Sequence, residues 1–373
     1  MDAKELQRRL NEVVANKVRH MIESHQPRVT ETMQRLAHEY EIAQDFLVPV
    51  GNIANSSSRM GFYGDERIQI YIPNQGAFNL HNNALSQLGE KMGIPPKYLR
   101  ELSDGSPWQR QLAVTILNEH GSQIGQNRYL VRAVGNEVRG VLSDSYRRLN
   151  SQLMLAKFIE RAVRHGAVMC DAYMSDTKVW AETINPQPIC IPTQQNGDVI
   201  IYMGARFSTS DYGDGAVDMR AFLLNGVCLN GMVRETVMKK IHLGARLGDN
   251  MALSQRTYLL DTQTNVSAIS DITDSLFKPE NQHRTAIEIR RASEITVNFE
   301  KELAQLMKGR LLKDESEEVK KLLMVNNPED GLAGGPTLWK LTQAITAHAR
   351  NLEPVRCREL HEIAGDLMQR AAA

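Results

Sequence analysis

Two apolar runs flank the dipeptide Gly135-Asn136, and this pattern constrains the fold more than any other in the chain. The run before it reads Tyr-Leu-Val-Arg-Ala-Val, and the run after it includes Val-Arg-Gly-Val-Leu. Glycine and asparagine tolerate the positive φ angles that tight hairpin turns require, so this pattern is typical of a β-hairpin. We therefore expect two paired antiparallel strands between Tyr129 and Leu142.

Length and composition favour a folded protein larger than one average domain. The chain has 373 residues, of which 42% are hydrophobic and 24% are charged. Its formal net charge is zero, so any nucleic-acid contact must be a local patch. Four widely separated cysteines without a CxxC pair favour free thiols in the cytoplasm over a structural zinc site. No apolar run approaches the roughly 20 residues of a membrane span, so we expect no membrane anchor.

Hydrophobic periodicity predicts an α+β protein in three regions. Residues 1–60 are expected to be a helical N-terminal segment, with helices at 2–24 and 28–45. Residues 61–250 are expected to form one α+β core around a central mixed or antiparallel sheet. Residues 251–373 form the helical C-terminal third. The clearest expected strands are 67–72, 129–133, 138–142 and 199–203.

The first expected helix has a continuous apolar face. This face carries Leu6, Leu10, Val14, Val18 and Ile22. A helix with one apolar face must bury it against something, and the neighbouring sequence offers no strand. The N-terminal segment is therefore expected to be an oligomerisation arm, and the protein a homo-oligomer.

Two basic segments are the best candidates for a binding surface. Residues 128–148 contain five arginines and two acidic residues, and residues 234–246 contain four cations and one acid. Lysine and arginine bind phosphates by releasing counterions, and tyrosines can stack on single-stranded bases. The alternative is a solvated surface whose arginine stems pack on the sheet. The candidate residues are Arg128, Arg132, Arg139, Tyr146, Arg147, Arg148, Arg234, Lys239, Lys240 and Arg246.

Other chemistry has less support in the sequence. Asp211, Asp214 and Asp218 are close enough to suggest a Mg²⁺ or Ca²⁺ site, but a polar turn between strands accounts for them more simply. Cys228 lies between two Asn-Gly turns and is interpreted as a buried structural cysteine. Phosphate-binding loops and zinc-ligand spacings are absent from the sequence. We therefore expect no cofactor and no tightly bound metal, and the sequence favours a non-enzymatic protein.

Several phrases occur in order between about residue 80 and residue 350. They are Met92-Gly93-Ile94-Pro95-Pro96-Lys97-Tyr98-Leu99, Tyr129-Leu130-Val131-Arg132, Ser143-Asp144-Ser145-Tyr146, Phe222-Leu223-Leu224-Asn225-Gly226 with Asn230-Gly231-Met232, and Thr337-Leu338-Trp339 with Gln343-Ala344-Ile345-Thr346. On these phrases the chain resembles the phage/plasmid-like protein family called domain of unknown function 932. Gln343 stands where relatives often have asparagine. The resemblance implies a mobile element in a bacterial host cell, and it brings no established activity.

Three functions follow as hypotheses. The first is a non-enzymatic protein that binds single-stranded DNA, and anneals or protects strands. The second is an anti-defence or regulatory protein that binds a host protein, whose mark would be an exposed apolar or methionine-rich face. The third is a metal-dependent nuclease, which rests on the three aspartates.

Overall fold

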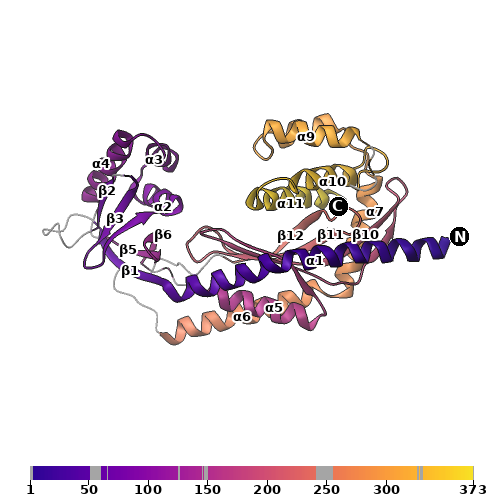
Figure 1. Cartoon of the computed structure of the whole chain (residues 1–373), viewed down its shortest axis with the longest axis horizontal. Helices are drawn as coiled ribbons and strands as arrows, with labels where there is room; N and C mark the ends of the chain where they lie inside the picture. The colour runs from indigo at the N-terminus through magenta and orange to yellow at the C-terminus, as the bar shows by residue number, and fades with distance from the viewer. Residues whose placement is uncertain are drawn as a thin grey trace.

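The computed structural model describes residues 3–50, 60–64, 66–124, 127–144, 146, 150–240, 255–325, 327 and 331–372. It confirms an α+β protein. The described strands form two separate sheets, one in a smaller lobe and one in a larger lobe, and the two lobes lie side by side along the long axis (Figure 1). The expectation of one sheet-containing core is therefore wrong. The four expected strands all exist, but the hairpin belongs to one sheet and residues 199–203 belong to the other.

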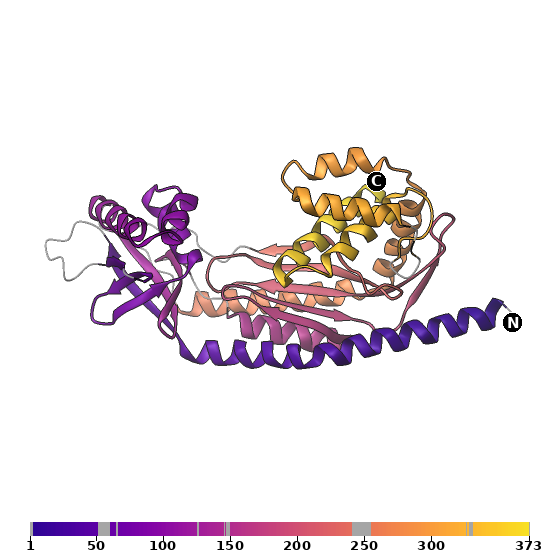
Figure 2. The ribbon, with the colours of Figure 1, turned by 45° about the horizontal axis from the view of Figure 1, so that its top comes forward.

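The N-terminal helix contacts both lobes. α1 (Ala3–Ile42) is one continuous helix that contains Pro27, so the expected break between two helices is absent. It runs beneath the larger lobe and leads into the smaller one (Figure 2). The expected helical residues 43–45 instead begin a strand, β1 (Ala43–Val50), in which Val48 and Val50 are buried on one face with the period of two that strands require. Residues 1–60 are thus not a separate helical segment.

Sheet A forms the smaller lobe. Its strand order is β1-β5-β6-β4-β3-β2, antiparallel except for the parallel pair β4 and β6. The predicted hairpin is confirmed as β5 and β6, joined at Gly135, whose φ is 56°. Three helices pack on one face of the sheet. The bounds are β2 (Gly61–Gly64), β3 (Ile68–Ile72), β4 (Gly76–Leu80), α2 (Asn82–Met92), α3 (Pro96–Ser103), α4 (Pro107–Gln123), β5 (Asn127–Val134) and β6 (Glu137–Ser143).

Sheet B forms the larger lobe. Its antiparallel order is β12-β11-β10-β8-β7, and β9 pairs with a further part of β10. The bounds are α5 (Ser151–Arg164), β7 (Val168–Met174), β8 (Val179–Ile184), β9 (Ile189–Pro192), β10 (Asp198–Thr209), β11 (Val217–Asn225), β12 (Gly231–Lys240), α6 (Gln255–Leu276), α7 (Pro279–Glu294), α8 (Phe299–Leu306), α9 (Lys313–Met324), α10 (Leu338–Ala349) and α11 (Pro354–Met368).

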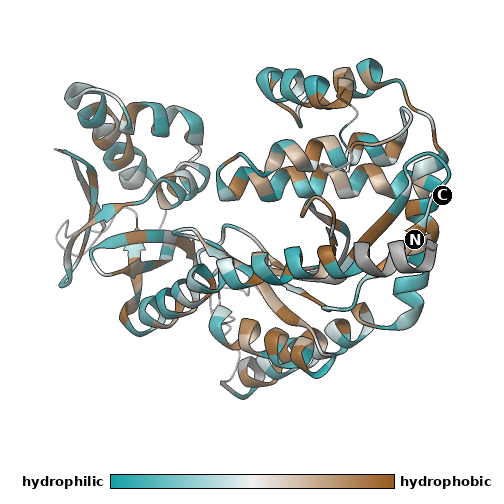
Figure 3. Cartoon of the chain, turned by 45° about the vertical axis from the view of Figure 1, so that its right-hand side comes forward, coloured by the Kyte–Doolittle hydropathy of each residue, from teal (hydrophilic) through white to brown (hydrophobic). Residues whose placement is uncertain are grey.

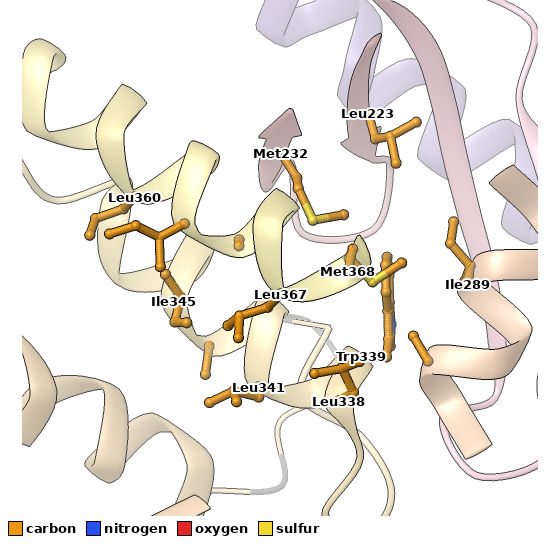
Figure 4. Packing of buried hydrophobic residues seen from close by; sticks show 14 of the residues in the cluster. Leu223, Met232, Ile289, Leu338, Trp339, Leu341, Ile345, Leu360, Leu367 and Met368 are labelled. Atoms are coloured by element: carbon orange, nitrogen blue, oxygen red, sulfur yellow. The ribbon is translucent and has the colours of Figure 1, made fainter. Parts of the chain in front are cut away.

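Both faces of sheet B are buried. Along β10, Val199 and Ile201 face the C-terminal helices, whereas Ile200 and Tyr202 face the side of α1. Hydrophobic residues therefore follow the strands between two helical layers (Figure 3). On the C-terminal side, the Trp339 ring packs among apolar side chains that include Met232 and Ile289 (Figure 4). This layer explains why the last third of the chain is helical and apolar on one side.

The apolar face of α1 packs within the chain. Val14 and Val18 are 3% and 2% exposed, and they contact a cluster on sheet B that includes Ile200 and Phe222. The side chains of Leu6 and Leu10 lie outside the described part of the helix. Sheet B therefore supplies the partner that the local sequence did not reveal, and this face gives no reason to expect an oligomerisation arm.

Candidate functional site at the lobe junction

Arg132 on β5 is fully buried where the two lobes meet. Its Nε and NH2 atoms donate to the two carboxylate oxygens of Asp45, at 2.6 and 2.7 Å. Its NH1 atom donates to the backbone oxygen of Asp211 in the larger lobe, and its guanidinium lies 5.7 Å from the centre of the Tyr146 ring. Burial alone would lower the pKa of Arg132, but the hydrogen bonds and charge of Asp45 raise it, so the guanidinium remains charged.

Arg139 on β6 makes a second link between the lobes. It donates to Glu39 Oε2 of α1 at 2.6 Å and to the backbone oxygen of Asp176, between β7 and β8, at 3.0 Å. Glu39 also accepts from Arg35 at 2.8 Å, and Arg35 donates to the Asp176 carboxylate at 2.6 Å. Burial would raise the pKa of Asp176, but the hydrogen bond from Arg35 and the charge of Arg139 lower it. Glu39 and Asp176 thus hold two arginines together at the junction.

These contacts correct the role expected for most of the basic candidates that the structure describes. Arg132, Arg139 and Arg234 are buried and satisfied by groups within the chain, so they do not form an exposed phosphate-binding surface. Arg234 donates to Glu288 and to the Thr285 hydroxyl of α7, each at 2.6 Å. A buried arginine requires such partners because an unpaired charge inside a protein is costly. Tyr146 is 9% exposed, so it is not available as a stacking platform either.

The remaining candidates divide into three groups. Arg128 is exposed, and its guanidinium lies 3.8 Å from the Asp144 carboxylate. The backbone of β12 places Lys239 opposite Asp218 and Lys240 opposite Val217, although the side chains of both lysines lie outside the described part of the strand. Arg147, Arg148 and Arg246 lie outside the described residues.

The three aspartates engage different partners. Asp211 Oδ2 accepts from the backbone nitrogen of Ser151 at 3.3 Å, at the N-terminus of α5. Asp214 accepts from the Thr177 hydroxyl, and Asp218 accepts from Arg220 at 2.8 Å. The interpretation as a polar turn is confirmed for residues 210–216, which connect β10 to β11, while Asp218 lies in β11. In the described part of the chain, no three His, Cys, Asp or Glu side chains are grouped to hold a metal ion.

The aspartate turn and the arginine hairpin, two separate candidates in the sequence, lie against each other. Besides the contact from Arg132 to Asp211, the backbone oxygen of Tyr212 accepts from Asn83 at 3.1 Å and from Gln87 at 2.8 Å. Asn83 and Gln87 on α2 carried no sequence signal, because they look like ordinary polar residues on the outside of a helix. The junction is therefore a satisfied polar interface that fixes the smaller lobe on the end of sheet B.

A second buried polar network joins sheet B to α11. Arg206 on β10 donates to Glu182 Oε1 at 2.7 Å and to Nδ1 of His361 at 2.8 Å. Burial would raise the pKa of Glu182, but the positive charges of Arg206 and Arg358 lower it to about 2. Burial and the charge of Arg206 lower the pKa of His361 to about 3.

Cys357 lies next to this network but lacks an activating base. Its sulfur is 3.6 Å from Nε2 of His361. An arginine can only donate, so Nδ1 of His361 accepts and the neutral ring carries its proton on Nε2, facing the sulfur. Burial also raises the pKa of Cys357 to about 11. This pair is therefore not arranged as a nucleophile and its base. Cys228 is buried as expected, and burial raises its pKa to about 11.

Comparisons with known proteins do not identify the chain. No protein-family model, curated protein or solved structure matches it. The resemblance to the phage/plasmid-like family stays a prediction. Among the described helices, none is both long and apolar enough to cross a membrane.

Proposed function

We propose that this chain binds single-stranded nucleic acid, without catalysing a reaction, through cations at the junction end of sheet B. The observation that carries the proposal is the meeting of the two basic segments. Tyr146 packs on Arg132, Arg132 donates to Asp211, and Val217, at the start of β11, pairs with Lys240. Tyr146 and the backbone of Lys240, one from each basic segment, therefore lie in the same region of the fold.

The burial of three candidate arginines narrows the set of residues that can contact phosphate. Arg132, Arg139 and Arg234 hold the fold, so their charge does not reach a ligand. Binding then depends on the other cations of the two segments, since phosphate affinity arises from counterion release. The proposed contacts are Arg128, Arg147, Arg148, Lys239, Lys240 and Arg246. The resemblance to a family of phage and plasmid proteins is consistent with this function.

A charge-matched pair of variants tests the proposal. In the first, Arg147, Arg148, Lys239 and Lys240 are changed to alanine. In the control, the exposed residues Arg290, Arg291, Lys320 and Lys321 of α7 and α9 are changed to alanine. Binding of labelled oligothymidylate is measured by fluorescence anisotropy at ~50 and ~200 mM salt.

We expect the junction variant to bind at least tenfold more weakly at low salt, and the control variant to bind like the parent. For every phosphate that the variant no longer neutralises, the slope of log affinity against log salt should also fall by roughly 0.7. Equal weakening in both variants would show that only net charge matters. A parent protein that does not bind at low salt would overturn the proposal.

A specific observation favours binding of a host protein as the second candidate. Met324 and Val325, adjacent residues at the end of α9, are 73% and 55% exposed. Exposed neighbouring apolar residues mark protein interaction sites. Binding to a host protein through these residues would persist at high salt and would be lost in Met324→Ser. Binding to nucleic acid would instead weaken as the salt concentration rises.

A further inference from the structure

A cavity of about 410 Å³ lies between β2 and α4, within the volume range of small-ligand sites. Figure 1 shows both elements at the end of the smaller lobe that faces away from the larger lobe. The outer edge of β2 is occupied, because the Met60 backbone nitrogen donates to the Pro49 oxygen of β1 at 3.3 Å and α4 packs along the strand. The cavity can therefore admit a small molecule but not a further strand.

Gly61 on β2 leaves a gap in the wall of this cavity. It lies directly opposite Tyr71 on β3 and two residues before Tyr63, so the three positions share one face of sheet A. A Cβ atom on Gly61 would meet only the Tyr63 side chain, at 3.9 Å. The φ angle of Gly61 is not positive, so the backbone does not require glycine there. The missing side chain instead allows a flat group to approach the strand closely.

Two aromatic rings and one fixed amide border the gap. The Tyr63 and Tyr71 rings line the cavity and meet edge to face, with centroids 6.2 Å apart. Asn118 of α4 donates from Nδ2 to the Phe62 backbone oxygen at 2.9 Å and accepts from the Phe62 nitrogen at 3.0 Å. A carboxamide has two N–H groups and two oxygen lone pairs, so these bonds fix its orientation and leave one of each.

The charge of the lining narrows the class of ligand. Among the described residues that line the cavity, none is charged. A phosphate, carboxylate or ammonium group would lose its hydration here without gaining a partner of opposite charge. A neutral aromatic ring loses little hydration and gains contact with the tyrosine rings. A ring that carries both donors and acceptors would also use the remaining sites of the amide.

We propose that this cavity binds a neutral, flat heteroaromatic ring the size of a nucleobase, which packs beside Tyr63 in the space left by Gly61 and hydrogen-bonds to Asn118. Bases stack readily on tyrosine because every base has a π face. The site lies away from the junction cations, and a base carries no phosphate. Binding of the ring therefore does not depend on the proposed binding of a nucleic-acid backbone.

The test uses the full chain and saturation-transfer NMR with adenosine and thymidine, which carry no charge. We expect at least one of them to bind the parent, with more saturation reaching the base protons than the ribose protons. Gly61→Val fills the gap with a residue that suits a strand, and Tyr63→Ala removes the 56% exposed ring. Each should weaken nucleoside binding at least tenfold while the protein stays folded. The control is Tyr98→Ala, an exposed ring on α3 outside the cavity, which should bind like the parent.

The proposal is overturned if neither nucleoside receives saturation from the parent, or if folded Gly61→Val and Tyr63→Ala bind like the parent. The junction variant should also bind nucleosides like the parent, and a loss there would place the nucleoside at the junction and overturn the proposal. Where the nucleoside binds as expected, oligothymidylate identifies the source of the base. Weaker binding of oligothymidylate to Gly61→Val would assign the base to a strand, and unchanged binding would assign it to a free small molecule.

Discussion

Arg206 on β10 and His361 on α11 face each other inside the larger lobe, with NH2 of the arginine 2.8 Å from Nδ1 of the imidazole. The arginine can only donate, so the contact requires a neutral histidine. This relationship makes the docking of α11 on sheet B sensitive to acid.

The stability of the protein should therefore fall as the pH drops below about 6.5. In the unfolded chain His361 takes up a proton near its ordinary pKa of 6.5, whereas in the folded chain its pKa is about 3. Between these values only the unfolded state gains the proton, at a cost to folding of about 1.4 kcal/mol per pH unit. The pKa of Glu182 is lowered from 4.5 to about 2, and its own loss of stability begins only below about 4.5.

Urea unfolding at several pH values between 7 and 5 checks this. His361→Asn keeps an acceptor for Arg206 and should flatten the pH dependence of the free energy of unfolding in that window. The control, His283→Asn on the exposed surface of α7, should keep the dependence of the parent. A curve for His361→Asn as steep as that of the parent would contradict the assignment.

Arg132→Ala should destabilise the fold. It removes a two-bond ion pair with Asp45 and the contact to Asp211, and breaking such a buried pair costs about 3–5 kcal/mol. We expect the lower end of this range because Asp45 is 38% exposed, so solvent can hydrate the carboxylate once the arginine is absent. Chemical denaturation measures the change. Arg128→Ala on the same strand is the exposed control and should change the free energy of unfolding by less than about 0.5 kcal/mol.

Two glycines in helices should respond to alanine in opposite directions. In α11, a Cβ atom on Gly365 would lie 1.4 Å from the backbone oxygen of Val233, so Gly365→Ala should push the helix off β12 and lower the Tm. In α4, Gly121 has open space, so Gly121→Ala should raise stability by up to about 1 kcal/mol through helix propensity. Thermal unfolding of both variants tests the pair. A stabilised Gly365→Ala protein would mean that α11 packs differently.

Asp211→Ala should lower stability, and magnesium should not affect the Tm of the parent. Asp211 places a carboxylate at the N-terminus of α5, an interaction worth about 0.5–2 kcal/mol. Asp214 and Asp218 bind other groups, so the three carboxylates do not share a cation. Thermal unfolding with and without Mg²⁺ measures both effects. A Tm that rises with Mg²⁺ in the parent but not in Asp211→Ala would restore the metal-site hypothesis.

The sequence predicted the local structure far better than the placement of its charges. The hairpin around Gly135 and the strand at 199–203 could be predicted because turn chemistry and alternation are local signals. The burial of Arg132 and Arg139 could not, because their carboxylate partners lie 87 and 100 residues away along the chain. A cluster of arginines looks the same in sequence whether it faces solvent or distant acids.

The contact between Asn118 and the backbone of β2 could not be predicted for a related reason. Its hydrogen bonds to Phe62 join a helix to a strand 56 residues earlier, and a single asparagine in a helix has no pattern of its own. β1 was missed because residues 43–45 continue the polar character of the helix before them. The strand is recognisable only once β5 is beside it, in a register that pairs Phe46 with Val131.

The position of α1 sets the order in which the two lobes can fold during synthesis on the ribosome. The helix is made first, yet the face that carries Val14 and Val18 rests on strands of sheet B, which emerge only after the whole smaller lobe has been synthesised. The smaller lobe can complete its sheet while α1 still lacks its partner. The larger lobe needs α1 from the start of the chain and the helices from its end, so it can be completed only late in translation. Until sheet B has been made, the nascent protein carries an apolar helix face that nothing covers.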